Sequence, residues 1–265
     1  MISEWQILSP VVPVDHARQV TSWDIVSAVM RGPGRPRLVV DLGCGDASSA
    51  KKLRAIHPGL EWIGVDVTRF PDADPDERIV LYDGVNLPFA DDSVPLIYSH
   101  QVFEHVRHPE PLLADIRRVL TPGGMFVGST SQLEPYHALS LWNYTFFGFK
   151  TIVEDAGLQL AEMRPGIDGI ALIRRQLDGA TQERNGWFND SPGNAEFDAW
   201  AESLGHGPQA LNMRKIHFCG QFVFKILKPT SAATTSTTAP SPAVLRVRRR
   251  LGRWAMSAGV RLLAR

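Results

Sequence analysis

The stretch of sequence that decides the fold reads VVDLGCGDA and covers residues 39–47. Its apolar first half, together with Leu38, predicts a buried strand over 38–42 that ends in a tight, glycine-rich turn. The residues that follow predict a helix over 47–56, which stops before Pro58. Glycine lets a backbone approach a ligand closely, and the first turn of a helix offers free N–H groups. This strand, turn and helix therefore predict a ligand-binding corner.

Apolar runs and helical spacings alternate along the chain beyond this corner. They predict strands over 60–65, 79–82, 95–99, 125–128, 158–163 and 217–227, and helices over 110–120 and 150–156. Strands that alternate with helices form a mainly parallel sheet with helices on both faces. The sequence therefore predicts an α/β fold whose ligand site lies at the carboxyl ends of the strands, near the topological switch point.

Composition predicts the domain organisation. We expect one α/β domain over residues 1–228, with a helical insert over 175–212 on the substrate side, before the last strand. Residues 229–243 are rich in Thr, Ser, Ala and Pro, which is typical of a flexible linker. Residues 244–265 hold seven arginines and no acidic residue, although the whole chain has 28 basic and 28 acidic residues. An acidic body with one basic tail indicates a local electrostatic site and not a nucleic-acid-binding surface.

Cysteine usage and apolar content indicate the compartment. The chain has two cysteines, and Cys44 lies inside the glycine-rich turn, so a disulfide framework is not expected. The first 13 residues have no basic start and no long apolar run, which disfavours a secretory signal. No stretch of about 18 apolar residues follows, so no membrane span is expected. These features predict a cytoplasmic protein.

Two aspartates extend the glycine-rich corner into a nucleoside site. Asp66 ends the second predicted strand, where a carboxylate can accept hydrogen bonds from both hydroxyls of a ribose. Asp83 ends the third strand, where a carboxylate can accept the exocyclic amine of adenine. The dinucleotide fingerprint G-x-G-x-x-G is not met, because Ser48 occupies the place of its third glycine. A glycine turn alone also serves tight folding, so the order of the three features carries the prediction.

From Val39 to about Leu158 the chain resembles class I S-adenosylmethionine methyltransferases of the broad methyltransferase type 11 group. The matching segments are DLGCG at 41–45, GVD at 64–66, DG at 83–84, LPF at 87–89, EHV at 104–106 and RVLTPGG at 118–124. The resemblance implies S-adenosyl-L-methionine as the cofactor. It also implies a Rossmann-like, seven-stranded sheet whose last strand is antiparallel.

The resemblance assigns residues to the cofactor as well. It implies that Gly43 and Gly45 pass the methionine part, that Asp66 binds the ribose, and that Asp83 and Gly84 contact the adenine. The expected cofactor set is completed by Asp41, Val67, Ser99 and His100. The chain departs from the group at two positions, Ala47 in place of a frequent third glycine and Pro95 in place of an acidic residue.

The residues after the fourth predicted strand lie where the transferred methyl group is expected. If Gln101 opens a helix, Gln101, Glu104 and His105 share one face at positions i, i+3 and i+4. That set could hold a divalent cation such as Mg²⁺, and His100 or His105 could act as a general base. Some similar O-methyltransferases use two glutamates and a histidine there, and Gln101 departs from that pattern. The alternative is that Glu104 and His105 only cap and pack the helix.

A second candidate follows the fifth predicted strand. His137, in the segment EPYH at 134–137, has a near-neutral intrinsic pKa and suits a general base. Four aromatic residues that could face a sugar or another flat ring come next: Trp142, Tyr144, Phe146 and Phe147. Similar stretches in methyltransferases of glycan pathways favour a saccharide hydroxyl as the acceptor. The alternative is that these aromatic residues belong to the core and that His137 is an ordinary loop residue.

Three functions stay open at this point. The first is O-methylation of a saccharide or other small hydroxylated acceptor, in polysaccharide biosynthesis. The second is methylation of a quinone-like, phenolic or lipid acceptor. The third is a non-catalytic, cofactor-binding partner subunit, which the aspartate set disfavours because a scaffold needs none of these carboxylates. The oligomeric state also stays open, a homodimer included.

The basic tail has an amphipathic pattern. On a helical wheel, Val247, Leu251 and Trp254 fall opposite Arg249 and Arg250. A basic amphipathic helix with a tryptophan is typical of peripheral contact with an anionic membrane, here its inner face. Docking on an acidic body and a tail without a role are the alternatives.

Overall fold

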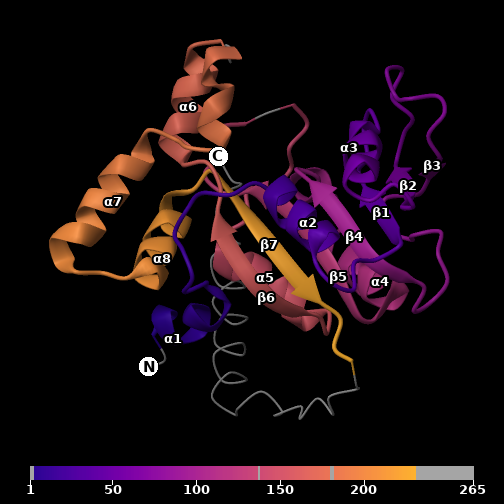
Figure 1. Cartoon of the computed structure of the whole chain (residues 1–265), viewed down its shortest axis with the longest axis horizontal. Coiled ribbons are helices and arrows are strands. Elements are labelled where there is room, and N and C mark those ends of the chain that lie inside the picture. Colours follow the sequence, from indigo (N-terminus) through magenta and orange to yellow (C-terminus); the bar gives the residue numbers. More distant parts are fainter. Residues whose placement is uncertain (1–2, 137, 180–181, 231–265) are drawn as a thin grey trace, which may run out of the picture. The chain divides into compact units, whose positions relative to one another are not determined.

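The computed structural model describes residues 3–136, 138–179 and 182–230, and residues up to Pro229 form one compact unit (Figure 1). The strands are β1 (Leu38–Leu42), β2 (Glu61–Asp66), β3 (Ile79–Leu81), β4 (Val94–His100), β5 (Leu120–Ser131), β6 (Gln159–Pro165) and β7 (Gln221–Leu227). The helices are α1 (Glu4–Leu8), α2 (Ser22–Arg31), α3 (Ser48–Ile56), α4 (Pro109–Val119), α5 (Phe146–Asp155), α6 (Gly169–Leu177), α7 (Gly193–Leu204) and α8 (Pro208–Phe218). Three 3-10 helices complete the described elements: η1 (Ser9–Val11), η2 (Phe103–His105) and η3 (Gln182–Phe188).

The seven strands form one sheet in the order β3-β2-β1-β4-β5-β7-β6. The strands from β3 across to β5 pair parallel with their neighbours. β7 lies between β5 and β6 and pairs antiparallel with both. The Rossmann-like, mainly parallel α/β fold with an antiparallel last strand is therefore confirmed.

Helices cover both faces of the sheet. Successive residues of a strand point to opposite faces, and β1 shows this with Val39 in one core cluster and Val40 in the other. On the Val40 face, α4 and α5 contribute fully buried side chains such as Ile116 and Phe149. On the Val39 face, α2 and α3 contribute residues such as Met30. Burial on both faces explains why the central strands read as continuous apolar runs.

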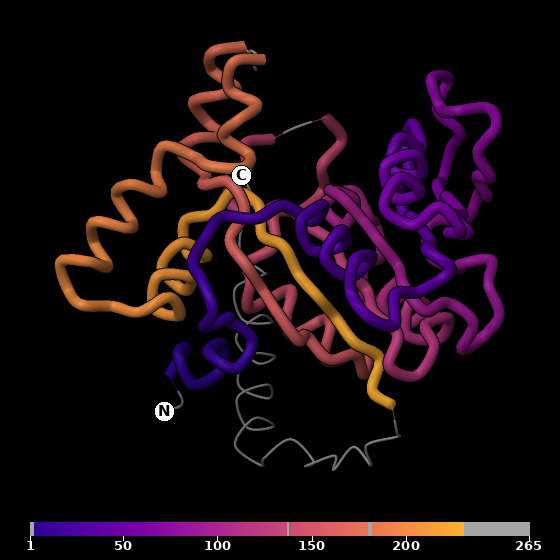
Figure 2. Tube along the Cα trace, in the orientation of Figure 1, coloured from indigo at the N-terminus to yellow at the C-terminus, as the bar shows by residue number. Residues whose placement is uncertain are grey.

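A helical insert separates β6 from β7 and contains α6, η3, α7 and α8 (Figure 2). It is longer than the predicted 175–212, because the Asp168 side chain caps α6 by accepting the N–H of Ala171 at 2.7 Å. β6 runs parallel to β5, and β7 runs antiparallel to both. The chain therefore leaves the sheet for the insert, and returns from it, at the end of the sheet where β1, β4 and β5 terminate.

Further predicted boundaries are wrong, among them the strand expected over 125–128, which as β5 covers Leu120–Ser131. The strand expected over 217–227 begins only at Gln221, because α8 starts with a proline at a first-turn position and continues to Phe218. A Cβ on Gly220, in the turn between α8 and β7, would lie 2.3 Å from Leu172 Cδ1, so a larger residue there would require Leu172 to shift. The helix expected over 150–156 begins earlier, because Thr145 caps α5 by accepting the N–H of Gly148 at 3.0 Å. No helix in the described part of the chain has the length and apolarity needed to span a membrane.

Candidate functional site

The strand order reverses beside β1. The chain passes from β1 to β2 on one side and places β4 on the other, so the carboxyl ends of β1 and β4 form the topological switch point. Open α/β sheets bind ligands in the crevice outside such a point. The sequence segment from Gly43 to Gly45 follows β1 directly, so it lies at this crevice.

The two glycines of this turn serve different purposes. Gly43 has a φ of +72°, and its N–H donates to Val65 O at 2.8 Å. A Cβ on Gly43 would lie 2.3 Å from Val102 Cγ2, so this position is closed to any larger residue. Gly45 has a φ of +52°, and a Cβ there would meet no heavy atom within 4 Å. Gly43 is therefore required by packing, whereas Gly45 leaves open space beside the turn.

Asp66 is the residue that ties the turn to β2. Its Oδ2 accepts the N–H of Gly45 at 3.1 Å, and its Oδ1 accepts the N–H of Val67 at 2.8 Å. The side chain is 7% exposed. Each carboxylate oxygen has two acceptor positions, and Oδ1 also accepts the N–H of Thr68 at 3.5 Å, so Oδ2 keeps a position for a ligand hydroxyl. The backbone thus holds Asp66 in one orientation at the crevice.

Asp83 is more exposed than Asp66, and its side chain accepts hydrogen bonds from the loop that follows β3. Its Oδ1 accepts the N–H groups of Val85 at 2.9 Å and Asn86 at 2.6 Å, and its Oδ2 accepts the side-chain amide of Asn86 at 2.6 Å. Hydrogen bonds from the Asn86 backbone, the Asn86 side chain and the Val85 backbone lower the pKa of Asp83 below its usual value. The carboxylate is therefore ionised at neutral pH and fixed in place beside Gly84.

Asp41 lies under the crevice and not in it. The side chain is 3% exposed and accepts a hydrogen bond from Ser49 Oγ, which in turn accepts Trp62 Nε1 at 3.0 Å. Burial raises the pKa of Asp41 to about 7, against the lowering effect of Ser49 and Trp62. This chain of hydrogen bonds joins the end of β1 to the first turn of α3. Ser49 and Trp62 were not among the predicted site residues, since neither stands in the glycine-rich motif.

Ser99 and His100 end β4 at the other side of the switch point. Ser99 is fully buried, and its Oγ has no hydrogen-bond partner among the described residues. His100 Nδ1 lies 2.9 Å from Ser22 Oγ and 3.1 Å from Ser129 Oγ. His100 is exposed at the end of β4, while partial desolvation of its ring and the positive charge of Lys52 lower its pKa, so the ring is neutral at neutral pH. Ser22 was missed from the sequence, although the capping box of Thr21 and Asp24 marks the start of its helix.

The predicted helix starting at Gln101 is wrong. β4 continues to His100, Gln101 has a φ of +54°, and only a single 3-10 turn follows, over η2. The Gln101 N–H still donates to Ser129 O at 3.1 Å, which holds this residue beside β5. Gln101, Glu104 and His105 therefore do not share a helical face. The described residues also contain no group of three His, Cys, Asp or Glu side chains placed to hold a metal ion.

Gln101 instead bridges two carboxylates. With its amide oriented to satisfy its neighbours, the nitrogen donates to Glu104 Oε1 at 2.9 Å and to Glu134 Oε2 at 3.2 Å. Glu104 is fully buried and also accepts Thr130 Oγ1 at 2.9 Å. Burial raises the pKa of Glu104, and the charge of Glu134 adds to that effect. The polar cluster after β4 and β5 is thus held together by side chains from three segments.

The loop after β5 is fastened to η2 by two of the predicted aromatic residues. Trp142 Nε1 donates to Val106 O at 2.8 Å, and the Tyr144 hydroxyl donates to Phe103 O at 3.1 Å. Trp142 is 47% exposed and Phe147 is 50% exposed, so both keep part of a ring face toward solvent. Phe146 and Tyr144 pack against the core, as the alternative interpretation expected. His137 lies outside the described residues.

Comparisons with known proteins agree with this architecture. Residues 40–128 match the family described as a methyltransferase domain. An uncharacterized methyltransferase of Mycobacterium sp. (strain JLS) is 36% identical over 116 residues, which are 41% of this chain and 45% of that protein. The chain thus spans about half the length, or less, of the curated relatives it matches.

Two solved structures are similar to this chain in fold. The cyclase SpnF shares 15% identity at a TM-score of 0.53, over 84% of this chain and 90% of that one. A putative sarcosine dimethylglycine methyltransferase from Galdieria sulphuraria shares 16% identity at a TM-score of 0.51, over 79% and 83%. The chain therefore has the class I methyltransferase fold, and its residues 40–128 are similar to a methyltransferase domain.

Proposed function

We propose that the protein is an S-adenosyl-L-methionine-dependent methyltransferase that methylates a hydroxyl group of a saccharide or another small hydroxylated acceptor. The observation that carries the proposal is the Gly43–Gly45 turn, fixed to the Asp66 carboxylate at the crevice between β1 and β4. These residues lie within the segment that matches the methyltransferase domain.

The residues present fit the proposed cofactor. The open space beside Gly45 gives room for the methionine part, while Asp66 and Val67 lie where a ribose would bind. Asp83 and Gly84 end the next strand toward the edge, where an adenine would follow. The cofactor, when bound, supplies a methyl group that is already activated on sulfur. The protein must then hold an acceptor oxygen in line and remove its proton, and positioning alone can supply about 7–11 kcal/mol.

We assign removal of the proton to His100. Its ring is neutral at neutral pH, and its Nδ1 lies beside the Ser22 and Ser129 hydroxyls at the end of β4. His105 and His137 stay predicted alternatives for the same role. A Mg²⁺ ion is left out of the proposal, because its predicted ligands depended on a helix that does not form.

The cofactor assignment predicts a large loss of affinity for one substitution. Asp66→Ala should weaken S-adenosylhomocysteine binding by about 1–3 kcal/mol, because the ribose hydroxyls lose their acceptors and the Gly45 turn loses its anchor. Isothermal titration calorimetry measures the change. The matched control is Asp72→Ala at an exposed position, which should bind normally. Unchanged affinity in a folded Asp66→Ala variant would contradict the cofactor assignment.

The acceptor is identified by transfer of a labelled methyl group from the cofactor into fractionated cell extract. Label in the saccharide fraction that resists mild base supports an ether on a sugar hydroxyl. Label confined to quinone, phenolic or lipid fractions overturns the saccharide assignment and supports the second candidate acceptor class. Bound cofactor with no transfer into any fraction indicates a partner subunit without catalysis.

The basic tail over 244–265 lies outside the described residues, as does most of the linker over 229–243, so their roles rest on sequence. We propose that the tail contacts anionic membrane from the cytoplasmic side, where lipid-linked glycans are made. In a co-sedimentation assay, the full chain should pellet with phosphatidylglycerol vesicles, whereas a chain ending at Pro229 should stay in the supernatant. Equal pelleting of the two at low salt would leave the tail without this role.

A further inference from the structure

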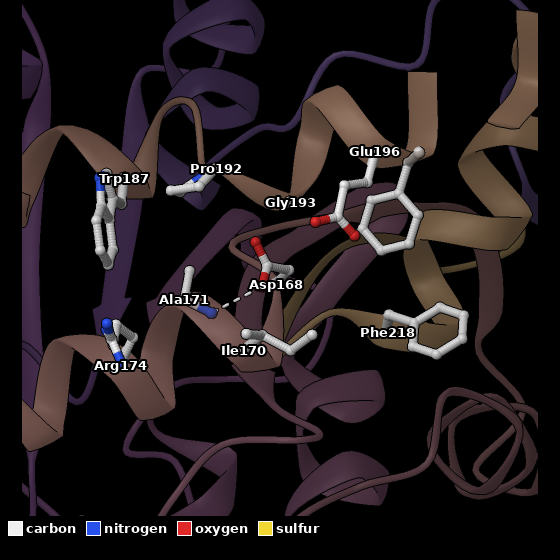
Figure 3. A pocket seen from close by; sticks show the side chains of 10 residues that line it. Asp168, Ile170, Ala171, Arg174, Trp187, Pro192, Gly193, Glu196 and Phe218 are labelled. Atoms are coloured by element: carbon white, nitrogen blue, oxygen red, sulfur yellow. Dashed lines mark hydrogen bonds between the residues drawn. The ribbon is translucent and has the colours of Figure 1, made fainter. Parts of the chain in front are cut away.

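The helical insert encloses a cavity that the proposed function does not use. Its volume is about 290 Å³, and it lies between α6, η3, α7 and the end of α8 (Figure 3). Its walls combine aromatic rings with two carboxylates, from Trp187, Phe197, Phe218, Asp168 and Glu196. A mostly apolar hollow with a few convergent polar groups is the usual form of a small-molecule site.

Asp168 offers the cavity an unused hydrogen-bond acceptor. The side chain is 5% exposed, and its Oδ1 accepts the N–H of Ala171, the dashed line in Figure 3. Its Oδ2 has no hydrogen-bond partner in the described part of the chain. Leaving a buried carboxylate oxygen without a donor is costly, so such an atom marks a place where a ligand group can bind.

The backbone around Asp168 stabilises its negative charge. Asp168 caps the N-terminus of α6, and α7 begins at Gly193 so close that a Cβ there would lie 2.8 Å from Asp168 Oδ2. The positive ends of two helix dipoles thus meet at one carboxylate. The Asp168 carboxylate therefore lies beside the N-termini of both helices at the wall of the cavity.

The lining of the cavity holds one more carboxylate and one guanidinium group. Glu196 adds a second carboxylate, which Figure 3 shows with Asp168 between Trp187 on one side and Phe218 on the other. Arg174 also lines the cavity, but its side chain is 69% exposed and its Nε lies 3.7 Å from Asp178 Oδ2. The Arg174 guanidinium is thus directed toward Asp178, a carboxylate that Arg184 also contacts.

Two of the aromatic walls already contact guanidinium groups. The Arg184 guanidinium lies 4.9 Å from the Trp187 ring centroid, and that of Arg214 lies 4.9 Å from the Phe218 ring centroid. Ring faces attract cations, and two carboxylates between such rings select a positively charged group over a neutral one.

We propose that this cavity binds the protonated amine of a small organic ligand, with the ammonium group on Asp168 Oδ2 and Glu196 and the carbon skeleton against Trp187 and Phe218. An amino sugar and an alkylamine share the required chemistry. The inference goes beyond the proposed function, since it needs neither the cofactor nor a saccharide acceptor.

Pairs of probes that differ in a single group test the proposal. D-glucosamine and n-propylamine, both protonated at pH 7, are titrated into the full chain beside D-glucose and n-propanol. The readout is the indole N–H resonance of Trp187, assigned with Trp187→Phe. Both amines should shift this resonance in a saturable way, and both neutral analogues should leave it in place. Asp168→Asn should weaken amine binding by about tenfold or more, because the charged acceptor is lost.

The variants keep the test specific. Asparagine is as good a cap as aspartate, so Asp168→Asn should keep α6 folded. Glu202→Gln, at an exposed position of α7, is the matched control and should bind the amines normally. Equal binding of glucose and glucosamine, or no shift with either amine, would overturn the proposal. S-adenosylhomocysteine affinity, which should not change in Asp168→Asn, reports separately on the proposed function.

Discussion

Gly43→Ala should lower the free energy of unfolding by about 2–5 kcal/mol and abolish measurable binding of S-adenosylhomocysteine. An alanine at a φ of +72° is strained by about 1–2 kcal/mol. Its Cβ would also lie 2.3 Å from Val102 Cγ2, and overpacking of this kind costs a further 1–3 kcal/mol or so. Urea denaturation measures the first effect, and calorimetry the second. Relief of the contact would displace either the turn or the η2 side of the crevice.

Two further variants separate strain from the clash. Gly34 has a φ of +69°, and a Cβ there would meet no heavy atom within 4 Å. The loss of stability in Gly34→Ala therefore measures the strain of the backbone angle alone. In a double-mutant cycle, Val102→Ala should recover part of the loss in Gly43→Ala, because it removes the methyl groups that clash. A Gly43→Ala variant no less stable than Gly34→Ala would show that the Val102 contact does not constrain the turn.

Asp41→Asn should remove a pH dependence of stability. Burial raises the pKa of Asp41 from 3.8 to about 7, so the folded protein holds a proton that the unfolded chain releases. The free energy of unfolding of the wild type therefore falls as pH rises from about 4 to about 7 and then levels off. Asparagine keeps a neutral acceptor for the Ser49 hydroxyl. Relative to the wild type, the variant should gain about 3 kcal/mol between pH 5 and pH 8.

Urea titrations of both proteins at several pH values give this difference. Other titrating groups, His100 among them, are present in both proteins and largely cancel in it. Asp72→Asn, at an exposed position, should show no such gain. Ser49→Ala should extend the fall above pH 7, because Ser49 is the side chain that most lowers the pKa of Asp41. A constant difference between Asp41→Asn and wild type across this range would contradict the raised pKa.

The fold was predictable because its central strands are buried on both faces. Continuous apolar runs located all seven strands, and the switch point followed from the glycine-rich turn after β1. The predicted helix boundaries were wrong where a capping side chain, which is not part of the hydrophobic pattern, sets the start of the helix. The Thr145 cap begins α5 early, and the Asp168 cap begins α6 before the predicted insert. Such caps depend on one hydrogen bond and leave little trace in hydrophobic periodicity.

The candidate site was predictable on the cofactor side and not on the acceptor side. Gly45 and Asp66 are joined by a hydrogen bond across 21 positions, and both stand in motifs. The sequence analysis predicted a helix at Gln101 because its polar spacing with Glu104 and His105 is helical. The same spacing is compatible with the short 3-10 turn that the structure has there. Ser22 and Asp168 lie far from the motifs in sequence and reach their sites only through the packing of α2 and the insert. Spacing along one segment cannot reveal groups that tertiary structure brings together.

The inner position of β7 has a consequence for biosynthesis. Among the described strands β7 is made last, yet it is the only strand that pairs with β6 and it closes the far edge of β5. A nascent chain that has not yet released residues 221–227 from the ribosome therefore carries an open strand edge on β5 and an unpaired β6. Open edges beside apolar surface favour association with other chains. We therefore expect the interval before β7 is released to be the stage of synthesis at which this sheet is most open to association with other chains.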